Sequence, residues 1–256
     1  MAPAQVVRRV LVTGGGRGLG AAIVKALAAA GHDVTFTYRS SGDAAEAAAK
    51  ALAAGYPGQR FAALRVDLSD RDAVAAFTAE LGDDARYDGF VHNAGHTYDA
   101  LAMMMDQAKA EVAMQVNYWS FTRLASALVR PMMRGRNGRV AVIGSVTALQ
   151  ANQGNAAYAA SKAALLAYAR TLAIEVARTG VTVNYVAPGF IDTEMLAPYA
   201  KFRDTMESQI PARRFATPEE IASVVAFLMS PAASYVTGAV LPVDGGLSAA
   251  LGVHRS

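Results

Sequence analysis

Short runs rich in β-branched residues alternate along this chain with longer alanine-rich stretches. This alternation is typical of repeated strand–helix–strand units, in which parallel strands are joined by helices that cross one face of the sheet. We expect strands at 6–12, 33–38, 60–66, 88–92, 139–144, 181–186 and 239–243. We expect helices at 18–30, 43–54, 70–81, 107–134, 155–179 and 218–229. The predicted fold class is therefore α/β, a single-domain Rossmann fold with a doubly wound parallel seven-stranded sheet flanked by helices.

The composition fits one folded domain and excludes several classes of protein. Of the 256 residues, 53% are hydrophobic and 18% are charged, so residues 1–256 can bury one large apolar core. The net charge is +3 without a dense run of Lys or Arg, which argues against a nucleic-acid partner. Because the chain has no cysteine, disulfides, thiolate metal sites and cysteine nucleophiles are excluded.

The apolar stretches are too short for a secretory leader or a membrane span. The apolar run that precedes Thr13 is shorter than the roughly 7–15 apolar residues that a signal peptide needs. Lys25, Arg170 and Glu175 interrupt the richest apolar stretches, so none reaches the ~18 residues of a spanning helix. The sequence predicts a soluble cytoplasmic protein without a membrane partner.

The first predicted strand is followed directly by a glycine-rich segment, Thr13-Gly14-Gly15-Gly16-Arg17-Gly18-Leu19-Gly20, which opens the first predicted helix. Glycines at this point remove the Cβ atoms that would keep a pyrophosphate away from the backbone N–H groups at the positive end of the helix. Three glycines can also form a plain turn, but their place in the first strand–helix–strand unit favours a dinucleotide site.

The second predicted strand lacks the acidic residue that is typical of NAD sites. Such sites carry an acid about 20 residues beyond the glycines, where it binds the ribose 2′-hydroxyl. Here the strand ends at Tyr38 and continues as Arg39-Ser40-Ser41. Arg39 and Arg17 would offer cations to a 2′-phosphate, although each can also be a solvated surface arginine. We therefore expect NADPH/NADP+ as the cofactor.

Tyr158 is the one tyrosine of ten that has a lysine four residues later, at Lys162. On a helix this spacing puts both side chains on one face. A phenol has a pKa of about 10, which a nearby ammonium lowers by favouring the phenolate. Ser145 follows the predicted strand 139–144, at the sheet edge where open α/β folds bind ligands. Ser145 could thus hydrogen-bond a substrate carbonyl while Tyr158 delivers a proton; the alternative is a core tyrosine beside a surface lysine.

The order and spacing of these residues resemble those of the short-chain dehydrogenase/reductase family over nearly the whole chain. The matching motifs are Thr13-Gly14-x-x-x-Gly18-x-Gly20, Asp67, Asn93-Ala94-Gly95, Asn117, Ser145, Tyr158-x-x-x-Lys162, Pro188-Gly189 and Asp244-Gly245-Gly246. The resemblance implies that Tyr158 is the general acid and that Ser145 orients the carbonyl. It implies that Lys162 binds the nicotinamide ribose and lowers the tyrosine pKa, and that Asn117 maintains a proton relay through water.

The same resemblance implies the cofactor contacts. Asp67 would contact adenine, Asn93 would support the fourth strand and the cofactor, and Thr193 would touch the nicotinamide carboxamide or phosphate. The expected cofactor-binding residues are Thr13, Gly14, Gly16, Arg17, Gly18, Leu19, Gly20, Arg39, Ser40, Asp67, Leu68, Asn93, Ala94, Gly95, Tyr158, Lys162, Pro188, Gly189, Ile191 and Thr193.

Within that family the chain is most similar to the 3-oxoacyl-[acyl carrier protein] reductases of fatty-acid and polyketide synthesis, over 143–146, 155–165 and 183–195. This similarity implies NADPH-dependent reduction of a β-ketoacyl thioester, on an acyl carrier protein, to the β-hydroxyacyl product. His92 replaces the usual Asn, and the loop 99–105 lacks the Asn usual there. Both departures lie near the expected substrate side, which would suit an unusual acyl group.

Other interpretations stay open. A reductase or dehydrogenase of a free small-molecule ketone, alcohol or sugar would use the same catalytic residues. A non-catalytic NADP-sensing protein would keep the glycine loop without needing Ser145, Tyr158 and Lys162 together. His92 and His96 have the spacing of zinc ligands, but the segment between them lacks the glutamate of such motifs and leaves a strand, so no metal is predicted.

Three expectations concern the lid, the assembly and the partner. The segment 188–216 is the longest irregular one and a lid candidate. Residues 156–178 leave little of the helix circumference polar, so one side should face the sheet and the other a second subunit. The resemblance implies a homotetramer built from this helix and 107–134. It also implies docking of the acidic carrier protein near Arg136 and Arg178, although cations at helix carboxyl ends also offset the helix dipole.

Overall fold

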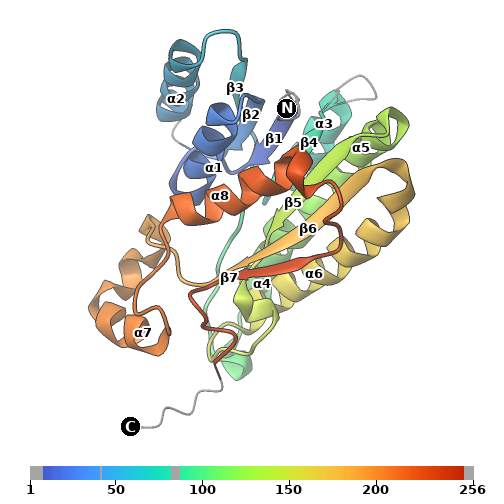
Figure 1. Ribbon diagram of the computed structural model, residues 1–256. Helices are drawn as coiled ribbons and strands as arrows, with labels where there is room; N and C mark the ends of the chain where they lie inside the picture. The colour runs from blue at the N-terminus through green and yellow to red at the C-terminus, as the bar shows by residue number, and fades with distance from the viewer. Residues whose placement is uncertain (1–7, 41, 82–86, 251–256) are drawn as a thin grey trace.

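The computed structural model describes residues 8–40, 42–81 and 87–250. Within these residues the chain forms a seven-stranded parallel sheet in the order β3-β2-β1-β4-β5-β6-β7 (Figure 1). The strands are β1 (Arg9–Thr13), β2 (Asp33–Tyr38), β3 (Phe61–Arg65), β4 (Gly89–His92), β5 (Gly138–Ile143), β6 (Val181–Pro188) and β7 (Val240–Val243). The predicted fold class is confirmed, and residues 6 and 7 of the first predicted strand lie outside the described residues.

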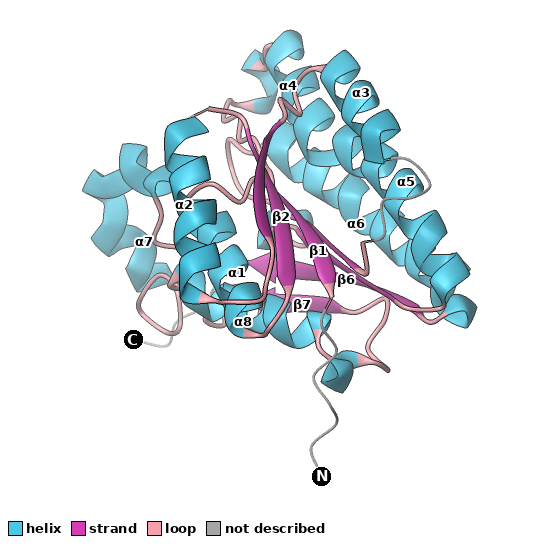
Figure 2. Ribbon diagram, turned by 90° about the horizontal axis from the view of Figure 1, so that it is seen from above, coloured by secondary structure: helices cyan, strands magenta, loops and turns pink. Residues whose placement is uncertain are grey.

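Helices cover both faces of this sheet (Figure 2). One face carries α1 (Gly18–Ala29), α2 (Gly42–Gly55) and α8 (Pro218–Met229), and the other carries α3 (Arg71–Leu81), α5 (Ser120–Gly135) and α6 (Ala156–Val176). Each face has its own apolar core: Val10 and Val12 point into the first, and Leu11 between them points into the second. A strand buried on both faces needs apolar residues at every position, which explains the continuous β-branched runs.

The strand order reverses between β1 and β4. The chain proceeds from β1 to β2 and β3 on one side, and from β4 to β5, β6 and β7 on the other. In open α/β sheets, ligands bind outside the carboxyl ends of the strands at such a switch point. Thr13, His92 and Ile143 end β1, β4 and β5 at this edge, so the segments that follow them lie at the same edge of the sheet.

The helix predicted over 107–134 is interrupted by a π-helical turn. α4 (Gln107–Met114) begins after Asp106, whose carboxylate accepts a hydrogen bond from the Lys109 N–H, and it runs through Gln115–Trp119 into α5. A π turn inserts one extra residue into a helix and is frequent at functional sites. Here the inserted turn contains Asn117, a predicted catalytic residue.

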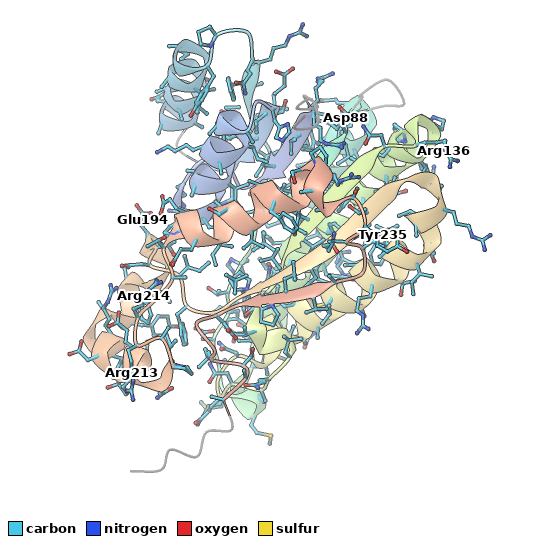
Figure 3. All side chains as sticks on the ribbon, in the orientation of Figure 1. Asp88, Arg136, Glu194, Arg213, Arg214 and Tyr235 are labelled. Carbon is cyan, nitrogen blue, oxygen red and sulfur yellow. The ribbon has the colours of Figure 1, made fainter. Side chains whose placement is uncertain are left out.

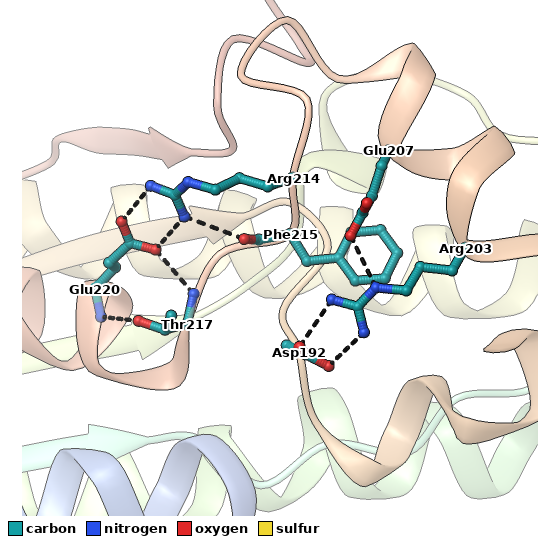
Figure 4. Close-up of polar contacts among 7 residues, drawn as sticks. All are labelled: Asp192, Arg203, Glu207, Arg214, Phe215, Thr217 and Glu220. Carbon is teal, nitrogen blue, oxygen red and sulfur yellow. Dashed lines mark hydrogen bonds and ion pairs between the residues drawn. The ribbon is translucent and has the colours of Figure 1, made fainter.

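Part of the segment 188–216 is helical, which corrects the prediction of an irregular segment for residues 194–209. Residues Glu194–Phe202 form 3-10 turns, and α7 (Arg203–Gln209) follows them. Such short helical turns are too brief to show the apolar period by which a sequence reveals a helix. Arg203 binds both carboxylate oxygens of Asp192 and one of Glu207, and its guanidinium lies 4.8 Å from the ring centre of Phe215 (Figure 4).

The helix α8 begins at Pro218, as predicted, and its first turn is capped by side chains. The Thr217 hydroxyl accepts a hydrogen bond from the Glu220 N–H, and the Glu220 carboxylate accepts one from the Thr217 N–H. Arg214 also binds both oxygens of this carboxylate, at 2.7 and 2.6 Å (Figure 4). Arg214 thereby ties the carboxyl end of the segment 188–216 to the first turn of α8.

None of the helices in the described part of the chain combines the length and the apolar character that crossing a bilayer requires.

Candidate active site

The four predicted catalytic residues lie together at the carboxyl edge of the sheet. Ser145 follows β5, Tyr158 and Lys162 lie in the first two turns of α6, and Asn117 lies in the π turn. The Lys162 ammonium lies 5.7 Å from the centre of the Tyr158 ring and donates to the Ile143 carbonyl at 2.9 Å. A Cβ on Gly95 would lie 3.5 Å from Asn117 Oδ1 and 3.6 Å from Lys162 Nζ, which places the segment after β4 against the same group.

The hydroxyl of Ser145 is oriented by a neighbour that the sequence analysis missed. The Thr147 N–H and the Thr147 hydroxyl both donate to Ser145 Oγ, at 3.1 and 2.8 Å. A serine oxygen accepts two hydrogen bonds and donates one. Because Thr147 fills both acceptor positions, the Ser145 proton is left to be donated to another oxygen, as a carbonyl-orienting residue requires.

Desolvation dominates the acid–base properties of Tyr158 and Lys162. Burial raises the pKa of Tyr158 to about 12, against a smaller lowering effect of the hydrogen bond with the Ser145 side chain. Burial lowers the pKa of Lys162 to about 8. The largest cause of the shift at Tyr158 is thus the removal of the phenolate from water, which disfavours the charged form. At neutral pH Tyr158 holds its proton.

Asn117 joins the segment after β4 to α6 through its side chain. Its amide NH₂ donates to the His96 carbonyl at 3.0 Å and to the Ser161 hydroxyl at 2.8 Å, and its amide oxygen accepts the His96 N–H at 2.8 Å. Asn117 is fully buried. The π turn thus holds the loop at 93–96 beside Lys162.

His92 lies inside the protein, which corrects the expectation that it lies near the substrate side. It is fully buried, and its Nε2 lies 3.3 Å from the Asn117 carbonyl, which can only accept, so Nε2 carries the proton. Its Nδ1 therefore accepts the Thr13 hydroxyl proton at 3.1 Å. Burial lowers the pKa of His92 to about 3, so the ring is neutral at physiological pH. With both nitrogens engaged, His92 cannot account for an unusual acyl group.

The glycine loop fits a phosphate group by its backbone. The helix α1 begins at Gly18 after Arg17 with no side-chain cap and no acidic residue in its first turn, so its N–H groups are free to meet an anion. A Cβ on Gly20 would lie 1.9 Å from the Gly14 carbonyl oxygen, so only glycine lets the helix start this close to the loop. The Asn93 side chain donates to the carbonyls of Thr13 and Gly14 and braces the loop.

Two other predicted cofactor segments border the same crevice. A Cβ on Gly18 would lie 3.7 Å from Thr193 Cγ2, and this puts the segment after β6, with Pro188, Gly189 and Ile191, beside the glycine loop. On the other side, the Asp67 carboxylate accepts from the N–H and hydroxyl of Ser69, and its hydrogen bond to the Ser69 hydroxyl is the largest cause that lowers its pKa. The backbone of Leu68 is fixed by Gln115, which donates to its carbonyl at 3.2 Å.

The two predicted phosphate-binding arginines are exposed at this edge. Arg17 pairs with Glu194 at 3.3 Å, and both side chains are about four-fifths exposed. Arg39 and Ser40 are exposed at the end of β2. The charge of Arg39 contributes to lowering the pKa of Asp67 and that of His96, so it lies close to both groups.

A family model described as Enoyl-(Acyl carrier protein) reductase matches residues 14–248. The 3-oxoacyl-[acyl-carrier-protein] reductase MabA of Mycobacterium tuberculosis is 42% identical over 96% of this chain and 94% of its own.

Two solved structures are also similar. A short-chain dehydrogenase/reductase from Serratia marcescens is 36% identical with a TM-score of 0.86, over 94% of this chain and 98% of its own. A putative NAD(P)-dependent gluconate 5-dehydrogenase from Beutenbergia cavernae, solved with bound NADP, is 36% identical with a TM-score of 0.91, over 97% of this chain and all of its own. The chain belongs to the short-chain dehydrogenase/reductase family.

Proposed function

We propose that this protein is an NADPH-dependent reductase of β-ketoacyl thioesters carried on an acyl carrier protein. The observation that carries the proposal is the meeting of three groups at one edge of the sheet: the donating hydroxyl of Ser145, the protonated phenol of Tyr158 and the buried ammonium of Lys162. The uncapped start of α1 and the cations Arg17 and Arg39 supply the adjoining cofactor site.

In this proposal Ser145 and Tyr158 both donate to the oxygen of the β-keto group, which draws electrons from the carbonyl carbon. NADPH, when bound, supplies the hydride that this carbon accepts. Tyr158 transfers its proton to the oxygen, so the C=O group becomes a CH–OH group and the phenol becomes a phenolate. The Lys162 ammonium stabilises that phenolate, and Asn117 holds the loop through which a proton would return to it.

The cofactor contacts are proposed for the residues expected from the sequence. The glycine loop and the first turn of α1 would bind the pyrophosphate, Asp67 and Leu68 the adenine, and Thr193 the nicotinamide end. Arg39 and Arg17 would bind the 2′-phosphate. The same proposal treats residues 1–256 as one catalytic domain in which 188–216 is the lid.

A carbonyl is a better match to this site than an enoyl double bond. The name of MabA refers to a 3-oxoacyl substrate, and the description of the matched family model refers to an enoyl substrate. Two neighbouring hydroxyl donors, Ser145 and Tyr158, suit an oxygen with two lone pairs. A free ketone or sugar is the second candidate, since the Beutenbergia relative is described as a gluconate dehydrogenase.

The proposed docking residues lie far from the active site of their own subunit. Arg136, labelled in Figure 3, donates to the Arg178 carbonyl at 3.4 Å next to the amino end of β5. Ser145 follows the carboxyl end of the same strand, at the opposite edge of the sheet. Tyr158 and Arg178 are separated by twenty residues, mostly helical, or about 30 Å. A carrier protein bound at this pair would therefore have to serve the active site of a neighbouring subunit.

We also propose a homotetramer, because a carrier protein bound at Arg136 and Arg178 would have to serve the active site of a neighbouring subunit. Ile174, in α6, is 80% exposed to solvent, and Trp119, directly before α5, is 46% exposed. Apolar residues so exposed on adjoining helices are typical of a subunit interface.

Exchanging both Arg136 and Arg178 for Glu tests the docking of the carrier protein. It should raise the KM for a carrier-linked substrate severalfold at low salt and leave the KM for a small thioester analogue unchanged.

The deciding experiment is a substrate panel. Purified protein is assayed for NADPH oxidation with β-ketoacyl carrier protein, a carrier-free β-ketoacyl thioester, simple ketones and a keto sugar, and separately with an enoyl thioester. The proposal requires the highest kcat/KM on the carrier-linked β-keto substrate. A higher value on the sugar, or on the enoyl thioester, would overturn it.

A further inference from the structure

A buried tyrosine outside the predicted site bridges its two halves. Tyr185 lies in β6 and is 1% exposed. Its hydroxyl oxygen accepts the Ser145 N–H at 3.1 Å, and its proton is donated to the Lys162 carbonyl at 3.2 Å. The directions are fixed, because an N–H can only donate and a carbonyl can only accept. One phenol thus joins the strand end that carries Ser145 to the helix that carries Tyr158 and Lys162.

The ring of Tyr185 is packed against the backbone at the end of β5. A Cβ on Gly144 would lie 1.7 Å from Tyr185 Cζ and 2.0 Å from its Oη, so the ring occupies the space that any side chain at 144 would need. The strands β5 and β6 are paired up to Ile143 and Val186, and the Gly144 N–H donates to the Val186 carbonyl at 2.8 Å. The hydroxyl therefore cannot shift without moving the end of β5.

A second hydrogen bond joins the same two segments from the other direction. The Lys162 ammonium donates to the Ile143 carbonyl at 2.9 Å. The segment 143–145 is thus tied to α6 at two points, one through the side chain of Lys162 and one through its backbone. If NADPH draws the ammonium toward its ribose, the contact through Tyr185 is the one that does not depend on the charge of Lys162.

Among residues 8–40, 42–81 and 87–250, the hydrogen-bond partners of the Tyr185 hydroxyl are the Ser145 N–H and the Lys162 carbonyl. Burying a phenol without a hydrogen bond is costly, and a phenylalanine would fill the same apolar space at lower cost. Burial raises the pKa of Tyr185, so the phenol stays protonated, and its proton is held by the backbone carbonyl of Lys162. Its contribution is to hold two backbone groups at a fixed separation.

We propose that Tyr185 is a positioning residue, which sets Ser145 relative to α6 so that the hydroxyls of Ser145 and Tyr158 converge on one substrate oxygen. This inference rests on the proposed carbonyl reduction. Misplacing a catalytic donor by about 1 Å can cost a hundredfold in rate, so the loss of one such tie should reach the chemical step.

The test is Tyr185→Phe, which keeps the ring and removes the hydroxyl. We expect kcat for β-ketoacyl reduction to fall about tenfold, or about 1.4 kcal/mol, while the Kd for NADPH changes less than twofold. Tyr168→Phe is the control, because it removes a phenol from a partly buried position in α6, where the ring packs against Tyr118 and Phe121 and not against Ser145 or Lys162. It should leave kcat unchanged.

A double-mutant cycle separates positioning from general stabilisation. In a Ser145→Ala background, followed under single-turnover conditions, Tyr185→Phe should cost less than twofold more, since the hydroxyl that it positions is absent. A full tenfold loss in that background, or no loss of kcat in the wild-type background, overturns the inference.

If Tyr185→Phe does not fold, hydrogen exchange on the wild-type protein is the second test. Fast exchange of the Ser145 amide would show that its hydrogen bond to Tyr185 is not formed and would overturn the inference. Absence of reductase activity in the wild type would instead refute the proposed function.

Discussion

The exchange Arg39→Asp should reverse or remove the preference for NADPH over NADH. A charge-assisted hydrogen bond to phosphate contributes about 1.5–3 kcal/mol, or roughly 10–150-fold in affinity. Arg39 is exposed, which argues for the lower end of that range. Arg17 must first leave Glu194, but an exposed ion pair of this kind is worth at most about 1 kcal/mol, so its contribution is reduced and not removed. We therefore expect the wild type to bind NADPH about tenfold or more tightly than NADH.

The assay is the Kd of each cofactor, measured by nicotinamide fluorescence at low salt. Arg60→Asp is the control, because Arg60 is exposed next to the amino end of β3 and changes the net charge by the same amount at the opposite edge of the sheet. Arg39→Asp should bring the ratio of the two Kd values to about one or below, and Arg60→Asp should leave it unchanged. Equal effects of the two variants would mean that the preference comes from overall charge, and would refute the assignment of Arg39.

Three further outcomes follow from contacts in the structure. Because burial lowers the pKa of Lys162 to about 8 while that of Tyr158 stays at about 12, kcat/KM for reduction should be flat from pH 6 to 7.5 and fall above pH 8 as Lys162 loses its charge; a profile flat to pH 10 would contradict this. Thr147→Val, which removes one of the two bonds that orient Ser145, should lower kcat about 2–12-fold, and Thr147→Ser should restore it; equal rates for both variants would dismiss the role of the hydroxyl. Thr217→Ala removes the cap of α8 and should lower the free energy of unfolding by about 1 kcal/mol in urea without changing kcat.

The sequence indicates that Ser145, Tyr158 and Lys162 lie together because each has a local signal, whereas Asn117 is expected only from the family resemblance. Tyr158 and Lys162 share a helix face by their spacing, and Ser145 follows a predicted strand, so the carboxyl edge of a parallel sheet brings them together. The order of the strands and the two apolar cores follow from the same alternation of short and long segments. These features depend on spacing along the chain, which a sequence displays directly.

The rest depends on partners that a sequence does not display. Tyr185 bonds to two backbone groups, which carry no residue identity, and its strand position indicates only a core residue. His92 lies in a strand buried on both faces, so nothing in its position shows whether it points to Thr13 or to a substrate. The pKa of Tyr158 depends on how deeply its ring is buried, and spacing alone emphasises the ammonium of Lys162 instead.

The most direct test of the proposed reduction is Tyr158→Phe, followed by single-turnover oxidation of NADPH with a β-ketoacyl substrate. The ring remains, so the Kd for NADPH should stay within about twofold of the wild type. The rate of reduction should fall about 10²–10⁴-fold, since the proton donor is gone. A variant that keeps more than a tenth of the wild-type rate, with chemistry limiting, would contradict the assignment of Tyr158 as the acid and with it the mechanism proposed for this site.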